Sequence, residues 1–139
     1  MTDILDLRFG ATLPTVVLPA VSAEKMKTMA ALLSDSNPIH FDVNAVRALG
    51  MGERPVNQGP TNMAYVMNYL GEVFGSVNDV RKLSVRFVGN VCAGDILEVS
   101  GTVDEVDVDL CTLTIQLRIQ GGPLALTARA SVTRRAVTQ

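Results

Sequence analysis

The chain has 139 residues, of which 47% are apolar and 19% are charged. This is the length of one domain, and so large an apolar share excludes a disordered chain. We therefore expect residues 1–139 to form a single domain, with a mostly aliphatic core because aromatic residues make up only 4%. The net charge of −2 and the absence of a basic run argue against a nucleic-acid partner.

Three features of the sequence favour a cytoplasmic protein with no membrane partner. No stretch is long and apolar enough to cross a bilayer. The first residues lack the basic and apolar regions of a secretory signal. The two cysteines, Cys92 and Cys111, do not form a CxxC motif, and we interpret them as free thiols rather than a disulfide.

The first third of the chain predicts one short strand and two helices. Leu13–Val17 is a short apolar run typical of a strand. Ser22 can cap a helix through its hydroxyl, and Asp42 can cap a second helix, Val43–Leu49, that Gly50 closes. One face of the first helix would carry the apolar residues Met26, Met29, Ala30 and Leu33.

A longer helix follows a loop rich in glycine and proline at residues 50–59. Pro60 suits the first turn of a helix. Helical spacing then relates the apolar residues Met63, Ala64, Met67, Leu70, Gly71 and Phe74. So broad an apolar side indicates a helix that other elements enclose. We interpret the methionines as core residues rather than as a binding surface.

From Val80 onward, apolar and polar residues alternate, which is typical of strands. The expected strands are Leu83–Phe87, Ile96–Val106, Leu113–Ile119 and Leu124–Val132. Short turns, among them Gly121-Gly122, favour a mostly antiparallel sheet. The pattern as a whole predicts an α+β fold in which the sheet curls around the long helix.

The only histidine, His40, lies in the segment Asp35-Ser-Asn-Pro-Ile-His-Phe-Asp42. Histidine titrates near neutral pH and is the usual proton-transfer group in enzymes. Pro38 bends the segment and could bring Asp35 and His40 to face one cleft. From spacing alone, a plain structural interpretation stays open, in which His40 is a polar loop residue and Asp42 only a helix cap.

A second candidate group is the backbone amide of Gly59, at the start of the long helix. Its N–H could bind an oxygen that gains negative charge, whereas Pro60 has no N–H to offer. The alternative is that Gly59 is only the N-cap. Arg54 and Glu53, a few residues earlier, could equally form a surface ion pair.

Other chemistries find no support in the sequence. One histidine and two distant cysteines cannot assemble a standard zinc site, so we expect no metal. The dinucleotide, P-loop and serine-hydrolase motifs are absent, so we expect no bound cofactor.

The segment from Asp35 to Asp42, followed by Glu53-Arg-Pro-Val and then Gly59, resembles the MaoC-like, (R)-specific enoyl-CoA hydratase family of hot-dog-fold proteins. Leu83-Ser-Val-Arg-Phe87 and the Gly94-Asp95 turn also resemble that family, so the likeness spans nearly the whole chain. It implies a long helix wrapped by a curved antiparallel sheet and a homodimer or higher homo-oligomer. A thioester channel would lie at the subunit interface.

The resemblance also implies roles for individual residues. Asp35 and His40 would be the catalytic pair, and the Gly59 N–H would polarise the thioester carbonyl. Asn37 would help to hold the loop, and with Gln58 and Arg54 it is a candidate for substrate binding. Gln58 stands where the family usually has histidine, Pro60 where a larger apolar residue is common, and Asn90 where proline often occurs.

The implied reaction is reversible hydration of trans-2-enoyl thioesters to (R)-3-hydroxyacyl thioesters, with coenzyme A or an acyl carrier as the handle. His40 would be the base and Asp35 the acid or an orienting group, and the two residues could share these roles. Two alternatives stay open at this point. The chain could be a hot-dog thioesterase, or it could be one subunit of a hetero-oligomeric dehydratase.

Overall fold

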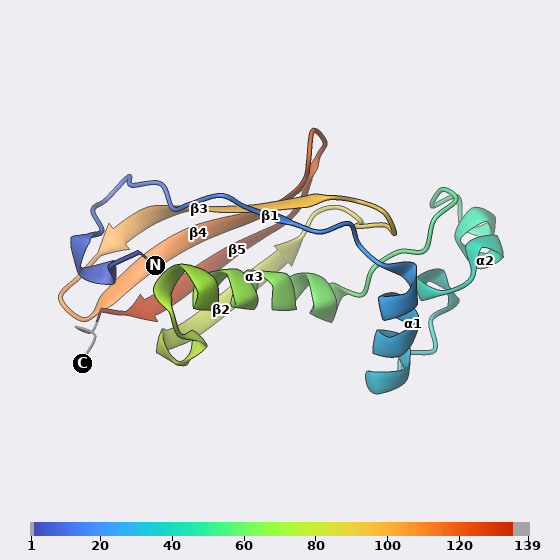
Figure 1. Ribbon diagram of the computed structural model, residues 1–139, viewed down its shortest axis with the longest axis horizontal. Helices are drawn as coiled ribbons and strands as arrows, with labels where there is room; N and C mark the ends of the chain where they lie inside the picture. Colours follow the sequence, from blue (N-terminus) through green and yellow to red (C-terminus); the bar gives the residue numbers. More distant parts are fainter. Residues whose placement is uncertain (1, 135–139) are drawn as a thin grey trace.

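The computed structural model describes residues 2–134, and one long helix lies along its five-stranded sheet (Figure 1). This helix, α3, spans Gly59–Phe74. The strands are β1 Val16–Leu18, β2 Val80–Phe87, β3 Leu97–Val106, β4 Leu110–Ile119 and β5 Leu124–Thr133. The α+β fold and the helix enclosed by a sheet are therefore confirmed.

All neighbouring strands in the sheet are antiparallel, and their order is β1-β3-β4-β5-β2. Strand β2 pairs with β5, with Val85 opposite Ala128, and not with β3, which follows it in the chain. Residues 88–96 carry the chain across the sheet between these two strands. The alternating pattern predicted the strands, but it held no information about this crossover.

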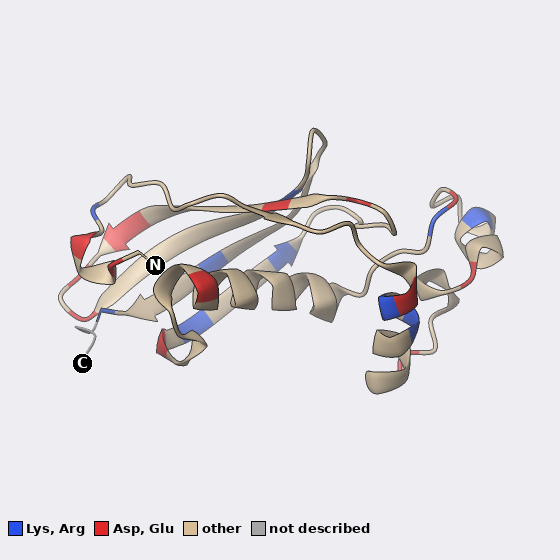
Figure 2. Ribbon diagram, viewed as in Figure 1, with Lys and Arg blue, Asp and Glu red and all other residues tan. Residues whose placement is uncertain are grey.

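The core lies between α3 and the inward side chains of β3, β4 and β5. Val66, Tyr69, Leu70 and Val73 face the sheet from α3, each at most 5% exposed. Each fully buried Leu or Val contributes about 1.5–3 kcal/mol relative to an exposed one. Figure 2 shows α3 almost free of charged residues, in keeping with its enclosed position.

The remaining helices lie beyond the end of the sheet, next to the N-terminus of α3 (Figure 1). They are α1 Ala23–Leu32 and α2 Val43–Ala48, joined through the 3-10 turn η2 Pro38–His40. Two further 3-10 turns are η1 Ile4–Asp6 and η3 Val77–Asp79.

The predicted caps of the two short helices are confirmed. The Ser22 hydroxyl accepts from Lys25 N at 3.2 Å, and the Asp42 carboxylate accepts from Asn44 N at 2.9 Å. Both side chains satisfy N–H groups that have no partner within the helix. The strand expected at Leu13–Val17 begins later in the structure, at Val16.

Several apolar residues expected inside are exposed. Leu33, at the C-cap of α1, is 41% exposed, and Met63 is 36% exposed. Ile96, 41% exposed, precedes β3 instead of starting it. These positions lie at element ends or on the side of α3 away from the sheet, where periodicity alone cannot determine burial.

The structure also bears on the cysteines and on membrane association. Cys92 and Cys111 are both free, as the sequence predicted, and burial raises the pKa of each thiol. Within residues 2–134, no helix has the length and apolar character needed to cross a bilayer.

Candidate active site

The segment that carries the histidine is held by its own polar groups. The Asn37 side chain accepts from Ile39 N at 3.3 Å and so caps η2, with Pro38 in the first turn. Asparagine is a favoured cap, and proline is tolerated where an N–H has no partner. This Asn-Pro pair fixes where His40 lies relative to the end of α1. The role of holding the loop, expected for Asn37, matches these contacts.

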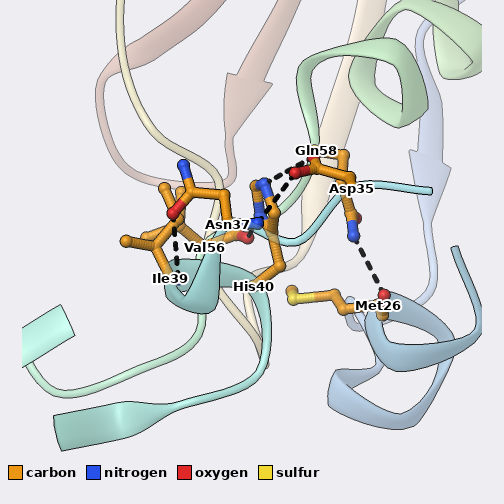
Figure 3. A network of polar contacts seen from close by, with 7 residues as sticks. All are labelled: Met26, Asp35, Asn37, Ile39, His40, Val56 and Gln58. Carbon is orange, nitrogen blue, oxygen red and sulfur yellow. Dashed lines mark hydrogen bonds and ion pairs between the residues drawn. The ribbon is translucent and has the colours of Figure 1, made fainter. Parts of the chain in front are cut away.

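Asp35 and His40 meet across this bend (Figure 3). His40 Nε2 lies 3.1 Å from Asp35 Oδ2. The other carboxylate oxygen of Asp35 accepts from Asn37 N at 3.0 Å, while Asp35 N donates to Ala30 O at the end of α1. The His40 side chain is 8% exposed and that of Asp35 is 32% exposed. The two groups therefore form one pair that is reached from the Asp35 side.

A main-chain contact sets the orientation of the His40 ring. His40 Nδ1 lies 2.6 Å from the main-chain oxygen of Val56, which can only accept, so Nδ1 carries a hydrogen. Nε2 is then the ring nitrogen that faces Asp35.

The first turn of α3 leaves one backbone donor unused. Thr61 N and Asn62 N both donate to Gln58 O, each at 3.1 Å, and Pro60 has no N–H. Gly59 N–H is the remaining donor of this turn, and among residues 2–134 no acceptor lies within hydrogen-bond reach of it. The positive end of the helix dipole lies at the same place. An oxygen that gains negative charge would be stabilised there.

Two findings on α3 refine the sequence interpretation. Gly59 is the first residue of the helix, and the N-cap is Gln58, so the alternative that Gly59 is only the cap is wrong. A Cβ atom placed on Gly59 would lie 3.3 Å from Cζ of Phe87. The ring of Phe87, 52% exposed at the end of β2, thus packs against Gly59 instead of pointing into the core.

Gln58 is fully buried and makes a structural contact. Its Nε2 donates to Met26 O in α1 at 2.9 Å, which joins α1 to the start of α3 (Figure 3). Its Oε1 is buried, and no described residue donates to it. Gln58 therefore lies next to the candidate donor Gly59, with one polar atom unsatisfied.

Arg54 is engaged with the protein itself. Its Nη1 donates to Ala93 O and to Asp95 Oδ1, both at 2.8 Å, and the hydrogen bond to Asp95 raises the pKa of the guanidinium. The alternative of an Arg54–Glu53 ion pair is wrong, because Glu53 instead lies 3.5 Å from Arg47. The prediction that Arg54 binds substrate stays untested beside this contact.

An open hollow of about 550 Å³ lies on the Asp35 side of the pair. Asp35 lines it together with residues at the end of α1 and Phe41. Within the described part of the chain, no group of three or more His, Cys, Asp or Glu side chains is placed to hold a metal ion. The hollow therefore offers access to Asp35 from solvent.

Sequence reasoning did not find the groups that position the pair. The acceptor for His40 Nδ1 is a main-chain oxygen, Val56 O, and the partner of Gln58 is another, Met26 O. Backbone oxygens leave no signal in the residue types. Asp95 and Phe87 are distant in sequence from Arg54 and Gly59, and only the folded chain brings them together.

The helix enclosed by an antiparallel sheet is the hot-dog fold of MaoC-like hydratases and dehydratases. The family model described as "MaoC like domain" matches residues 9–116. The chain therefore belongs to the MaoC-like domain family.

Individual relatives agree with this assignment. The chain is 34% identical over 116 residues to the "(R)-specific enoyl-CoA hydratase" of Aeromonas caviae, covering 79% of this chain and 84% of the relative. The solved (R)-hydratase from A. caviae, described as involved in PHA biosynthesis, matches with a TM-score of 0.79 and 27% identity over 91% of this chain and 96% of that one. The MaoC-like dehydratase from Rhodospirillum rubrum matches with a TM-score of 0.76 and 22% identity over 99% of this chain and 100% of that one.

Proposed function

We propose that the chain catalyses the reversible hydration of trans-2-enoyl thioesters to (R)-3-hydroxyacyl thioesters. Its relationship to a curated (R)-specific enoyl-CoA hydratase places it among the hydro-lyases. The observation that carries the specific proposal is the 3.1 Å contact between His40 Nε2 and Asp35 Oδ2, open to solvent on one side. An acid–base pair of this kind is what the addition of water across a double bond requires.

The two groups of the pair would carry the two proton transfers of the reaction. A water molecule bound to both groups gives one proton to the basic member as its oxygen attacks C3 of the substrate. The other member, in its acid form, gives a proton to C2. The pair ends with the same number of protons that it had at the start. Because both groups lie on one side of the substrate, oxygen and hydrogen add to the same face.

We assign the role of base to His40 and the role of acid or orienting group to Asp35. The hydrogen on Nδ1, held by Val56 O, leaves Nε2 as the nitrogen that faces Asp35. The same contact fixes the ring orientation. In the dehydration direction the two groups exchange these roles.

Gly59 N–H would stabilise the charge that develops on the thioester oxygen. A preorganised backbone donor of this kind contributes about 2.7–4 kcal/mol in other enzymes. The chemistry asks for no cofactor in this proposal, and coenzyme A or an acyl carrier serves as the handle of the substrate. No bond of coenzyme A or of the acyl carrier forms or breaks in the reaction.

We further propose that the chain acts as a homo-oligomer. Strand β2 is an edge of the sheet, and the apolar side chains Phe87 and Val88 at its end are 52% and 48% exposed. An exposed edge next to apolar side chains is a site for association. The ChsH1-ChsH2 complex from Mycobacterium tuberculosis, a structural neighbour with a TM-score of 0.79, 22% identity and coverage of 92% of this chain and 98% of that one, joins two differently named chains and corresponds to the hetero-oligomer alternative. Light scattering on the purified chain tests self-association.

The reaction is tested with crotonyl-CoA and longer enoyl-CoA thioesters. We expect the conjugated absorbance to fall as water adds, and the product to be the (R)-3-hydroxyacyl thioester on chiral analysis. A thiol reagent distinguishes the thioesterase alternative, because hydration leaves the thioester intact. Release of free coenzyme A without loss of the double bond would overturn the proposal.

A further inference from the structure

Phe87, the last residue of β2, borders the proposed oxyanion donor. Strand β2 runs toward the N-terminal turn of α3 and ends beside it (Figure 1). A Cβ atom placed on Gly59 would lie 3.3, 3.5 and 3.8 Å from Cζ, Cε1 and Cε2 of the Phe87 ring, which are the three nearest atoms. The tip of the ring, and not its base, therefore meets Gly59.

The ring fills the place that a side chain at position 59 would take. Gly59 precedes Val66 by seven residues, so the two lie on the same face of α3, and Val66 is fully buried on the sheet side. Gly59 is not among the glycines with positive φ, so its backbone conformation is open to other residues. The close approach of Phe87 is what favours glycine here.

The backbone around Phe87 is held to β5. Phe87 lies opposite Leu126 in the β2–β5 pair. Just after it, Val88 N and Gly89 N both donate to Ala125 O, at 3.0 and 3.1 Å. The ring therefore projects from a point of the sheet that main-chain hydrogen bonds fix.

The ring also lies close to the amide that would bind the thioester oxygen. The Gly59 nitrogen and a Cβ atom at that position would be bonded to the same Cα, so Cζ of Phe87 lies no more than about 6 Å from the nitrogen. Phe87 is nevertheless 52% exposed. A carbonyl oxygen bonded to Gly59 N–H at about 2.9 Å would place the thioester group within reach of the uncovered part of the ring.

A ring in this position has two effects on a bound thioester. It excludes water from one side of the Gly59 N–H, and a hydrogen bond to a developing charge is stronger where water is excluded. It also limits the positions that the thioester carbonyl can take. Misplacement of a substrate by about 1 Å can reduce a rate by about 10²-fold. Neither effect requires the ring to contact Asp35 or His40.

We infer that Phe87 is a positioning residue for the reaction and that it acts through the Gly59 amide. Its ring forms the sheet-side wall of the carbonyl site and keeps the thioester oxygen in line with the N–H group. This inference rests on the proposed function and extends it to a residue that comes from another element of the fold.

The inference is tested by steady-state hydration of crotonyl-CoA by Phe87→Leu, at matched folded fraction with wild type. Leucine keeps an apolar side chain at the end of β2 but lacks the ring atoms that meet Gly59. We expect kcat to fall about tenfold and KM to change less than about threefold, because the ring orients the carbonyl while the rest of the substrate supplies most of the binding. An unchanged kcat, or a rise in KM alone, overturns the inference.

Val88→Ala is the matched control. Val88 is the next residue, is 48% exposed and is not among the atoms nearest to Gly59, so this variant should keep the wild-type kcat. Light scattering on both variants separates catalysis from association, since both residues lie at the edge proposed for self-association. An equal fall in kcat in Val88→Ala, or a fall in Phe87→Leu that accompanies loss of the oligomer, overturns the inference.

A double variant tests whether Phe87 acts through the amide. Gly59→Pro has no N–H at this position, so adding Phe87→Leu to it should lower kcat by less than about threefold more. A further tenfold fall would show that the ring acts elsewhere, and it overturns the inference.

The same assays separate this inference from the proposed function. If wild type hydrates crotonyl-CoA and Phe87→Leu has the same kcat, the inference is overturned and the proposed function stands. If wild type hydrates neither crotonyl-CoA nor longer enoyl-CoA thioesters, the proposed function fails and the inference fails with it.

Discussion

Gln58 Nε2 donates to the main-chain oxygen of Met26 at 2.9 Å, and this bond joins the start of α3 to the middle of α1. The helix that leads to Asp35 and the turn that presents Gly59 are thereby fixed to each other. The Gln58 side chain therefore links the two helices through this hydrogen bond, and its amide does not take up or release a proton as an acid or base would. The family usually has histidine at this position, which also can donate one hydrogen bond.

Replacing Gln58 by leucine should destabilise the fold. Gln58→Leu removes the hydrogen bond to Met26 O, which costs about 0.5–1.5 kcal/mol, because Met26 lies within α1 and its oxygen can still accept from the helix. Urea denaturation measures the change in the free energy of unfolding. Gln120→Leu is the control, because Gln120 is exposed and should change stability by less than about 0.5 kcal/mol. Equal stability of Gln58→Leu and wild type would contradict the connecting role.

The role of the Gly59 amide can be isolated with two substitutions. Gly59→Pro removes the N–H at a position where proline suits the helix, and should lower kcat by about 10²–10³. Gly59→Ala keeps the N–H but adds the same Cβ, 3.3 Å from the movable ring of Phe87. It should therefore keep most of the activity. Similar kcat values for the two variants would show that crowding, and not the lost donor, is responsible.

The Arg54–Asp95 pair should contribute to stability. Asp95 is 9% exposed and also accepts from Cys92 N at 2.8 Å, so it holds the 92–95 turn against the segment before α3. Arg54 is 53% exposed, so solvent screens the pair. Arg54→Met should lower the free energy of unfolding by about 1 kcal/mol. A roughly tenfold rise in KM for enoyl-CoA with unchanged stability would instead support substrate binding by Arg54.

Much of the fold and the central pair could be predicted from the sequence, because both depend on local patterns. Period-two alternation predicted β2 to β5, and the Asn-Pro bend predicted that Asp35 and His40 converge. The rest depends on contacts between distant residues. The pairing of β2 with β5 and the packing of Phe87 on Gly59 follow from how the chain crosses the sheet.

Tyr69 should make stability depend on alkaline pH. Burial raises the pKa of Tyr69 to about 12, whereas the pKa of a tyrosine in the unfolded chain is about 10. The unfolded chain loses this proton at lower pH than the folded chain does. Stability is therefore full below about pH 10 and falls as the pH rises toward about 12. Thermal melts should show a smaller alkaline decrease for Tyr69→Phe than for wild type. Parallel decreases would contradict this assignment.

The most direct measurement is steady-state hydration of crotonyl-CoA by His40→Ala and Asp35→Asn, each compared with wild type at matched folded fraction. Each variant removes one of the two proposed proton-transfer groups, so each should lower kcat by about 10²–10⁴. Because the two groups act together, the double variant should be little worse than either single one. Turnover near the wild-type rate in both single variants would show that the 3.1 Å contact between these side chains has no part in catalysis.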